Sequence, residues 1–192
     1  MKKYELTQKT ISQSGKILYR IKALKDFGDV KVGDLGGYIE VESNLSHHDN
    51  CWVYDNALVY DNAHVYGNAL VTGNALVTGN ALVTGNALVT GNAYVYGDAY
   101  VYGNALVTGN ALVTGKSHLK NFDEISRAEH CFNILGFKYP ITVTPTSINI
   151  GCESYNFDML DQKIEHEDFS QDEIKRIKMM IEMALEQILE KI

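Results

Sequence analysis

A six-residue word repeats almost without change from position 55 to position 115. Its commonest form is Gly-Asn-Ala-Leu-Val-Thr, and the variants place Asp, Tyr or His at some of its positions. A strict short period is typical of a solenoid, because each repeat can bury its apolar side only against the next turn. The same uniformity leaves few unique polar residues from which an active site could be built.

Within each word the residues alternate as they do in a strand, whose successive side chains point to opposite faces. We therefore predict that the Val and Ala positions point inward and that the Leu and Thr positions point outward. Gly and Asn interrupt the alternation and tolerate a left-handed backbone, so they predict a corner. With this register, Val77→Asp or Ala81→Asp should unfold the solenoid, whereas Thr78→Asp should be tolerated.

Three words make a coil of 18 residues, and this pattern resembles the hexapeptide-repeat family, best known from bacterial acyltransferases. The resemblance rests on an aliphatic residue followed four positions later by a small one, as in Val59 and Ala63. Gly73 departs from it, because it follows Val71 by two positions where those enzymes often have glycine after one. The resemblance implies an all-β solenoid, a triangular left-handed parallel β-helix.

The phase of the repeat extends back to Gly37, with His47 as a weak link, and forward to Leu119, after which Phe122 breaks it. An open β-helix exposes two apolar ends, so both ends need caps. We predict an N-terminal hairpin cap over 1–36 with its turn at 12–15, the β-helix over 37–120, and a C-terminal α+β cap over 121–192.

The C-terminal cap should contain two strands, 139–144 and 147–152, joined by Pro145-Thr146. Asn156 should cap a short helix, and Ser170 with Glu173 forms a capping box that opens a final helix reaching about Ile192. That amphipathic helix is acidic. Its apolar stripe suits packing on the chain's own body or association with another helix, and both readings stay open.

The formal net charge is −7, and residues 153–192 hold 11 acidic and 5 basic side chains. Because no basic stripe is present, the charge pattern argues against direct binding of nucleic acid. The acidic segment could contact a basic protein, mimic nucleic acid, or simply keep the protein in solution. The opening residues lack an apolar signal segment, no apolar run is long enough to span a membrane, and the three cysteines are widely spaced. We therefore expect a cytoplasmic protein.

The repeat contains few residues that could catalyse a reaction or bind a metal ion. His64 and His118 lie three coils apart on one outward column, too far for one metal ion to bridge. His47, His48 and Cys51 would divide between the inside and the outside of the coil. No residue is inserted within 55–115, so no loop leaves the coils there to wrap a CoA arm. We predict no catalytic residue, no cofactor and no metal site, with a hexapeptide-type acyltransferase as the alternative.

The outward columns are flat and nearly uncharged, and extensive exposed apolar patches normally mark an interface. Their threonines are similar to those of ice-binding β-helices, but tyrosines interrupt the ladder. We expect self-association as a dimer or trimer, and binding of a host or phage protein. The predicted interface residues are the leucines Leu70, Leu88 and Leu106, the tyrosines Tyr94, Tyr96, Tyr100 and Tyr102, and the isoleucines Ile174, Ile181 and Ile188.

Three non-repeat segments, YRIKALKDFGDVKVGDLGGYIE, SHHDNCWVYDNA and ITVTPTSINIGCESY, resemble a group of phage and prophage proteins. This resemblance carries over no catalytic residues. It implies a non-enzymatic accessory protein, in the cytoplasm of the host cell, that acts by binding another protein. Inhibition of a host defence system such as a CRISPR nuclease is one such role.

Overall fold

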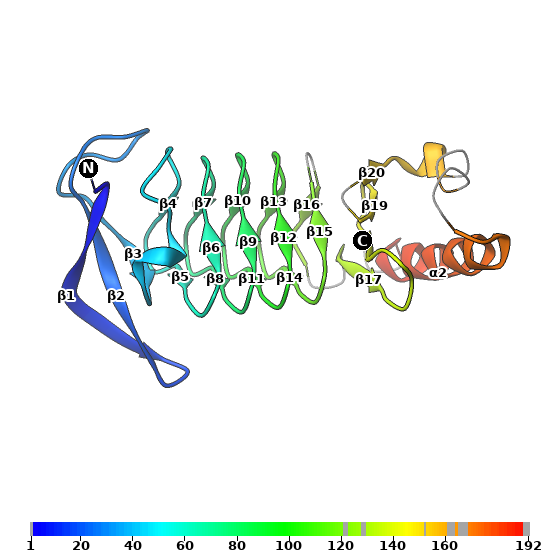
Figure 1. Cartoon of the computed structure of the whole chain (residues 1–192), viewed down its shortest axis with the longest axis horizontal. Coiled ribbons are helices and arrows are strands. Elements are labelled where there is room, and N and C mark those ends of the chain that lie inside the picture. Colours follow the sequence, from blue (N-terminus) through cyan, green and yellow to red (C-terminus); the bar gives the residue numbers. More distant parts are fainter. Residues whose placement is uncertain are drawn as a thin grey trace.

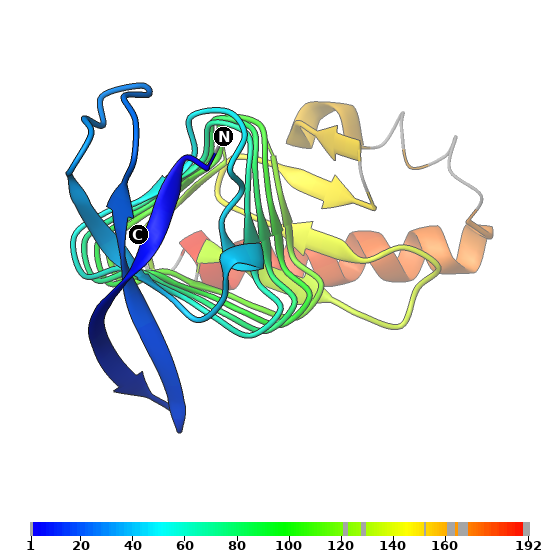
Figure 2. The same cartoon turned by 60° about the vertical axis from the view of Figure 1, so that its left-hand side comes forward.

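A computed structural model of the chain describes residues 2–120, 123–127, 130–151, 153–160, 164 and 169–189. The molecule is elongated, with a hairpin at one end, a solenoid in the middle and a long helix at the other end (Figure 1). The predicted class of fold is confirmed: the middle of the chain is a parallel β-solenoid whose coils stack as a triangular prism (Figure 2).

Each word forms a two-residue strand, and strands 18 residues apart pair in parallel. Leu88, for example, pairs with Leu70 on one side and with Leu106 on the other. The strands of the solenoid lie in three sheets, in the orders β3-β5-β8-β11-β14, β4-β7-β10-β13-β16 and β6-β9-β12-β15, where β3 is Leu35–Ile39. Their bounds are β4 (Trp52–Val53), β5 (Leu58–Val59), β6 (His64–Val65), β7 (Leu70–Val71), β8 (Leu76–Val77), β9 (Leu82–Val83), β10 (Leu88–Val89), β11 (Tyr94–Val95), β12 (Tyr100–Val101), β13 (Leu106–Val107), β14 (Leu112–Val113), β15 (His118–Leu119) and β16 (Glu124–Ile125).

The interior of the prism is a stack of valines and alanines. Every Val and Ala of the repeated words is at most 1% exposed, which confirms the predicted inward columns. The Leu positions are half-buried, as outward side chains on a packed solenoid should be. Thr78 departs from this pattern, because it is 5% exposed and its hydroxyl donates to Asp61. The expectation that Thr78→Asp is harmless therefore rests on a wrong premise, since the new carboxylate would be buried against Asp61.

The corners are held by two kinds of contact. Gly85 has φ +68°, and a Cβ added there would lie 2.8 Å from the backbone nitrogen of Gly103 in the next coil, so the close stacking of corners requires glycine. The asparagine side chains stack as amide ladders, such as Asn68 to Asn86 at 3.2 Å and Asn86 to Asn104 at 3.1 Å. These ladders link each corner to the corner of the next coil through exposed amide groups, each of which can donate and accept.

The N-terminal hairpin extends one of the solenoid sheets. β1 (Tyr4–Gln13) and β2 (Lys16–Ala23) are antiparallel, and β2 pairs with β3 (Leu35–Ile39), which in turn pairs in parallel with β5. The solenoid therefore begins within β3, and the tip of the hairpin projects beyond the prism (Figure 2). A short 3-10 helix, η1 (Glu42–Asn44), follows, and the Asn44 amide donates to the carbonyl of Ala63 at 2.8 Å.

The segment before β3 covers one outward position that the sequence leaves open. Trp52 belongs to the outward column of Leu70, yet it is 0% exposed. Its ring lies against Phe27, with centroids 5.2 Å apart, and against Tyr4 at 6.0 Å. The N-terminal segment thus closes both the end of the core and the first part of this sheet.

The solenoid continues past position 120. β16 pairs with β13, with Glu124 beside Leu106 and Ile125 beside Val107, and Ile125 is 0% exposed. The repeat therefore ends about one word later than the predicted boundary at 120, because Ile125 still fills the inward column. Phe122, the residue expected to break the phase, lies outside the described residues.

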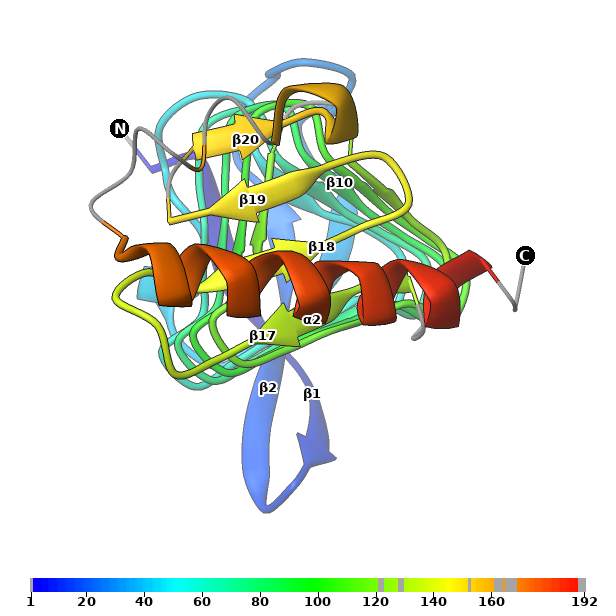
Figure 3. The same cartoon turned by 90° about the vertical axis from the view of Figure 1, so that its right-hand side faces the viewer.

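After the solenoid the chain forms an antiparallel sheet and a helix. The sheet has the order β17-β18-β19-β20, with β17 (Phe132–Ile134), β18 (Ile141–Val143), β19 (Ile148–Ile150) and β20 (Glu153–Tyr155). A 3-10 helix, η3 (Phe157–Met159), follows, and α2 (Gln171–Leu189) crosses the face of the sheet (Figure 3). At its start, Ser170 and Glu173 form the predicted capping box, with N–H to carboxylate at 2.9 Å.

The apolar stripe of α2 packs on the chain's own sheet. Ile174, Ile181 and Ile188 are 5%, 2% and 0% exposed and share a core with Ile141 and Ile148. Their predicted part in an interface is corrected here, because they form the hydrophobic core of the C-terminal unit. No helix among the described residues is both long and apolar enough to cross a membrane.

A buried carboxylate joins the last coil to the C-terminal sheet. Asp123 is 2% exposed, and its Oδ2 accepts from the Lys120 backbone N–H at 2.8 Å and from the Asn149 amide at 3.0 Å. Its Oδ1 lies within hydrogen-bond distance of the hydroxyls of Thr144, Thr146 and Ser147. The turn between β18 and β19 is thus held by a residue that lies next to β16.

Candidate binding surface at a tyrosine-rich corner

Four tyrosines surround one corner of the solenoid, and we call them the tyrosine corner: Tyr94, Tyr96, Tyr100 and Tyr102. The first two lie on and just after β11, and the other two lie on and just after β12, with Gly97 and Asp98 between them. Within each pair the rings stack, with centroids 4.6 Å and 4.5 Å apart. All four are half-buried, and the corner presents two pairs of stacked rings on adjacent faces.

The phenols of Tyr94 and Tyr100 have raised pKa values. The Tyr100 hydroxyl lies 3.5 Å from that of Tyr66, and this contact, together with burial, raises the pKa of Tyr100 to about 12. Burial also raises the pKa of Tyr94. At neutral pH both groups therefore keep their protons, and each can donate as well as accept.

Further side chains extend the aromatic surface along the β12 sheet. The ring of His118 stands edge-on to Tyr100, with centroids 5.8 Å apart, and Lys120 Nζ lies 5.6 Å from the centre of the Tyr102 ring. Burial lowers the pKa of His118, so its neutral form dominates at pH 7. His64 lies three coils away in the same column, as predicted, because the register runs from His64 through Leu82 and Tyr100 to His118.

The three predicted leucines form a separate surface. Leu70, Leu88 and Leu106 stack on β7, β10 and β13, whose sheet carries none of the four tyrosines. All three are half-buried. The structure therefore divides the predicted interface residues into a leucine row on one sheet, a tyrosine corner on the other two sheets, and three isoleucines in a core.

The hairpin covers the beginning of the β11 sheet. Tyr60, the counterpart of Tyr96 two coils earlier, is 5% exposed and packs with Leu18 and Tyr38. Lys16 of the hairpin holds this position by ion pairs to Asp61 at 2.6 Å and to Glu40 at 2.9 Å. The Lys16 ammonium is the main cause of the lowered pKa of Asp61. Tyr94 and Tyr96 therefore lie where the sheet first becomes free of the hairpin.

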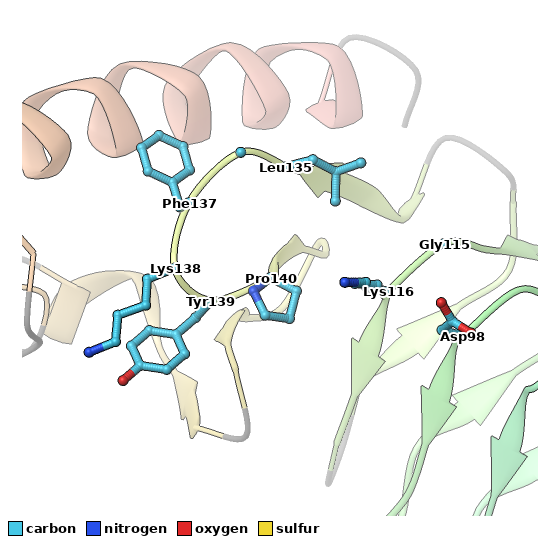
Figure 4. Close-up of a pocket in the computed structure, with 9 residues that line it drawn as sticks. Asp98, Gly115, Lys116, Leu135, Phe137, Lys138, Tyr139 and Pro140 are labelled. Atoms are coloured by element: carbon cyan, nitrogen blue, oxygen red, sulfur yellow. The ribbon is translucent and has the colours of Figure 1, made fainter.

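A pocket adjoins the tyrosine corner. The loop 135–140, between β17 and β18, comes up to the corner formed by Asp98, Gly115 and Lys116 and borders a half-open pocket of about 420 Å³ (Figure 4). Lys116 points from the solenoid toward Pro140, and Asp98 lies beside it. The other walls are largely apolar: Leu135, Gly136, Phe137 and Tyr139, with the Lys138 side chain along the Tyr139 ring.

The polar residues of this pocket replace asparagine in one corner ladder. Asn62 donates to Asn80 at 3.1 Å, Asn80 donates to Asp98 at 2.9 Å, and Lys116 occupies the same position one coil later. These two departures from the repeated word, 18 residues apart, were a signal available in the sequence. The apolar wall of the pocket could not be predicted from the sequence, because the loop 135–140 reaches the corner only through the packing of the C-terminal sheet.

The histidine–cysteine cluster at 47–51 is part of the N-terminal cap. Cys51 is buried, and its Sγ lies 3.2 Å from Lys3 Nζ, while His47 stacks on Tyr4 with ring centroids 4.3 Å apart. Burial raises the pKa of the Cys51 thiol and lowers the pKa of Lys3. Within the described ranges, no group of three His, Cys, Asp or Glu side chains has the geometry to hold a metal ion.

Comparison with known proteins identifies relatives of the repeat region. Residues 53–67, 63–79 and 99–115 match the YdcK beta solenoid repeat family. The uncharacterized acetyltransferase YdcK of Escherichia coli (strain K12) is 36% identical over 62 residues, which cover 28% of this chain and 19% of that protein. The match thus spans about a fifth of the relative's length. Together, these similarities support a relationship of the repeats to hexapeptide-type β-solenoids.

Proposed function

We propose that this protein is a non-catalytic binding scaffold that holds another protein at the tyrosine corner. The observation that carries the proposal is the two stacked pairs of half-buried tyrosines on adjacent faces. Tyrosine is one of the residues most enriched at the energetic centres of protein interfaces. The solenoid backbone already fixes these side chains, so little conformational entropy is lost when a partner binds.

The pocket provides a concave binding site next to the stacked tyrosines. Asp98 both connects β11 to β12 and lines the cavity, so the pocket and the tyrosine corner share a border. A pocket of about 420 Å³ has room for one large side chain of a partner, held between the loop 135–140, Lys116 and the Asp98 carboxylate. An interface with anchors in preformed pockets is the kind in which a few residues carry most of the binding energy.

The proposal predicts that Tyr96→Ser combined with Tyr100→Ser abolishes capture of the partner without unfolding the protein. Both residues point outward and are half-buried, outside the valine and alanine core. Loss of two aromatic anchors should weaken binding about a hundredfold or more. The experiment captures proteins from bacterial lysate on the tagged chain, identifies them by mass spectrometry, and measures each purified candidate by calorimetry. Tyr19→Ser, on the hairpin, is the matched control.

A protein bound by the wild type and by Tyr19→Ser, and lost from the double variant, would support the tyrosine corner. Binding that survives the double variant but is lost in Leu88→Glu would assign the interface to the leucine row instead. The narrower role of a phage accessory protein against a host defence nuclease stays a prediction. The identity of the captured partner is what tests it.

A second candidate function is acyl transfer, favoured by the relative named as an acetyltransferase. Two features of the site fit that alternative. The loop 135–140 supplies from outside the repeat an enclosing wall that 55–115 lacks, and His118 is neutral at pH 7, the form a general base requires. CoA and acetyl-CoA titrations by calorimetry separate the two proposals. The scaffold proposal expects no binding, whereas micromolar affinity that is lost in Lys116→Ala or His118→Ala would favour the enzyme.

A further inference from the structure

The outer face of α2, made by Lys175, Met179, Glu182, Met183 and Glu186, is uncovered at the end of the molecule (Figure 3). Met179 is 56% exposed and Met183 is 54% exposed, although the isoleucines on the opposite side of the same helix are almost completely buried. The two methionines are four residues apart, so they lie one above the other on the helix surface. They form an apolar pair in the middle of an otherwise polar face.

Charge is divided along this face. The first turn of α2 is acidic, with Asp172 and Glu173. Lys175 and Arg176 follow it and precede the methionine pair, and Glu182 and Glu186 lie in the second half of the helix. The methionine pair lies between the basic and the acidic part. Between Lys175 and Glu186 the face is basic before the methionines and acidic after them, so this section is complementary to itself when it is turned around.

We propose that a second copy of this chain docks on the outer face of α2, with the two helices antiparallel and related by a twofold axis near Ile181. In this arrangement Met179 of each copy meets Met183 of the other, and Lys175 and Arg176 approach Glu186. A twofold interface uses one patch on both subunits, which requires such self-complementarity. A parallel arrangement would oppose like charges, and it would also align the two helix dipoles unfavourably.

The same charge pattern argues against other occupants. A mimic of nucleic acid would present a uniformly acidic face to a basic partner, but here the acidic half is matched by a basic half. The leucine row could join copies through a different surface, and the test below separates the two. The proposal does not depend on the tyrosine corner, which lies on the solenoid.

The test is the molar mass in solution, measured by sedimentation velocity and light scattering from low to high micromolar concentration. The wild type should form a dimer. Met183→Glu should be monomeric and keep the wild-type circular dichroism spectrum, because position 183 is exposed in the monomer. Met159→Glu is the matched control, since Met159 is also exposed, at 43%, but lies on η3, and this variant should remain dimeric.

A charge exchange tests the antiparallel register. Lys175→Glu alone and Glu186→Lys alone should each raise the dissociation constant about tenfold, because each opposes like charges twice across the axis. The two changes together should restore the dimer. Lys175 is chosen because Arg176 also lies over the Phe137 ring, at 5.5 Å. A monomeric wild type at high micromolar concentration, a dimer that survives Met183→Glu, dissociation by Leu88→Glu, or failure of the double exchange to restore association would each overturn the proposal.

Discussion

Replacing Val77 with aspartate is expected to abolish the cooperative thermal unfolding of the solenoid and leave a chain without a stable β-structure. Val77 is 0% exposed and lies between Val59 and Val95 in an inward column. A carboxylate there would have no partner, and burying it costs several kcal/mol, a large part of the roughly 5–15 kcal/mol that stabilises a domain. Circular dichroism with thermal melting measures the effect.

The control for this substitution is Thr90→Asp. Thr90 is half-buried on an outward column, so the new charge can reach water and the melting temperature should change much less than in Val77→Asp. Thr78 is unsuitable as a control, because it is buried beside Asp61. Equal losses in Val77→Asp and Thr90→Asp would mean that the inward and outward columns do not differ in burial.

Asp123→Ala is expected to detach the C-terminal unit from the solenoid at a cost of about 3 kcal/mol or more. The substitution leaves buried donors, among them the Lys120 N–H and the Asn149 amide, without their acceptor. The repeats contact one another independently of this joint. Residues 130–189 should therefore become open to proteolysis and hydrogen exchange while the solenoid stays protected.

Asp29→Ala is the matched control, since Asp29 is an exposed carboxylate at the other end of the chain, and this variant should keep the wild-type protection throughout. If Asp123→Ala exposed the solenoid and the C-terminal unit together, the two would be one cooperative unit. If it exposed neither, the buried carboxylate would not be what joins them.

The parts of the fold that repeat could be predicted, because their structure is set by local alternation. Side chains alternate in direction within each six-residue word, and three words make one coil. These two facts predict the inward position of Val77, the 18-residue register and the column shared by His64 and His118. The capping box at Ser170 was equally predictable, since it depends on residues three positions apart.

What covers an outward residue could not be predicted in the same way. Trp52 and Leu88 occupy equivalent positions, yet one is buried by the N-terminal segment and the other is not. Ile181 and Met183 lie two residues apart on one helix, and only the packing of the sheet decides which of them is exposed. The pocket beside Asp98 depends on the same kind of contact between distant segments. The tyrosines of the candidate site could therefore be predicted from the sequence. Which segments adjoin them, and where the exposed surface ends, could not.

The 18-residue register links the number of repeated words to two quantities: the distance between the two ends of the solenoid and the rotation of one end relative to the other. Adding three words would insert one layer, move the hairpin and the C-terminal unit apart by about 4.8 Å, and leave every face aligned. Adding a single word would instead turn everything after it by about a third of a revolution, so that a stacked pair of tyrosines would move to the next side of the prism. Changes in repeat number can thus set the distance between the two ends independently of their relative orientation, provided that whole coils are gained or lost.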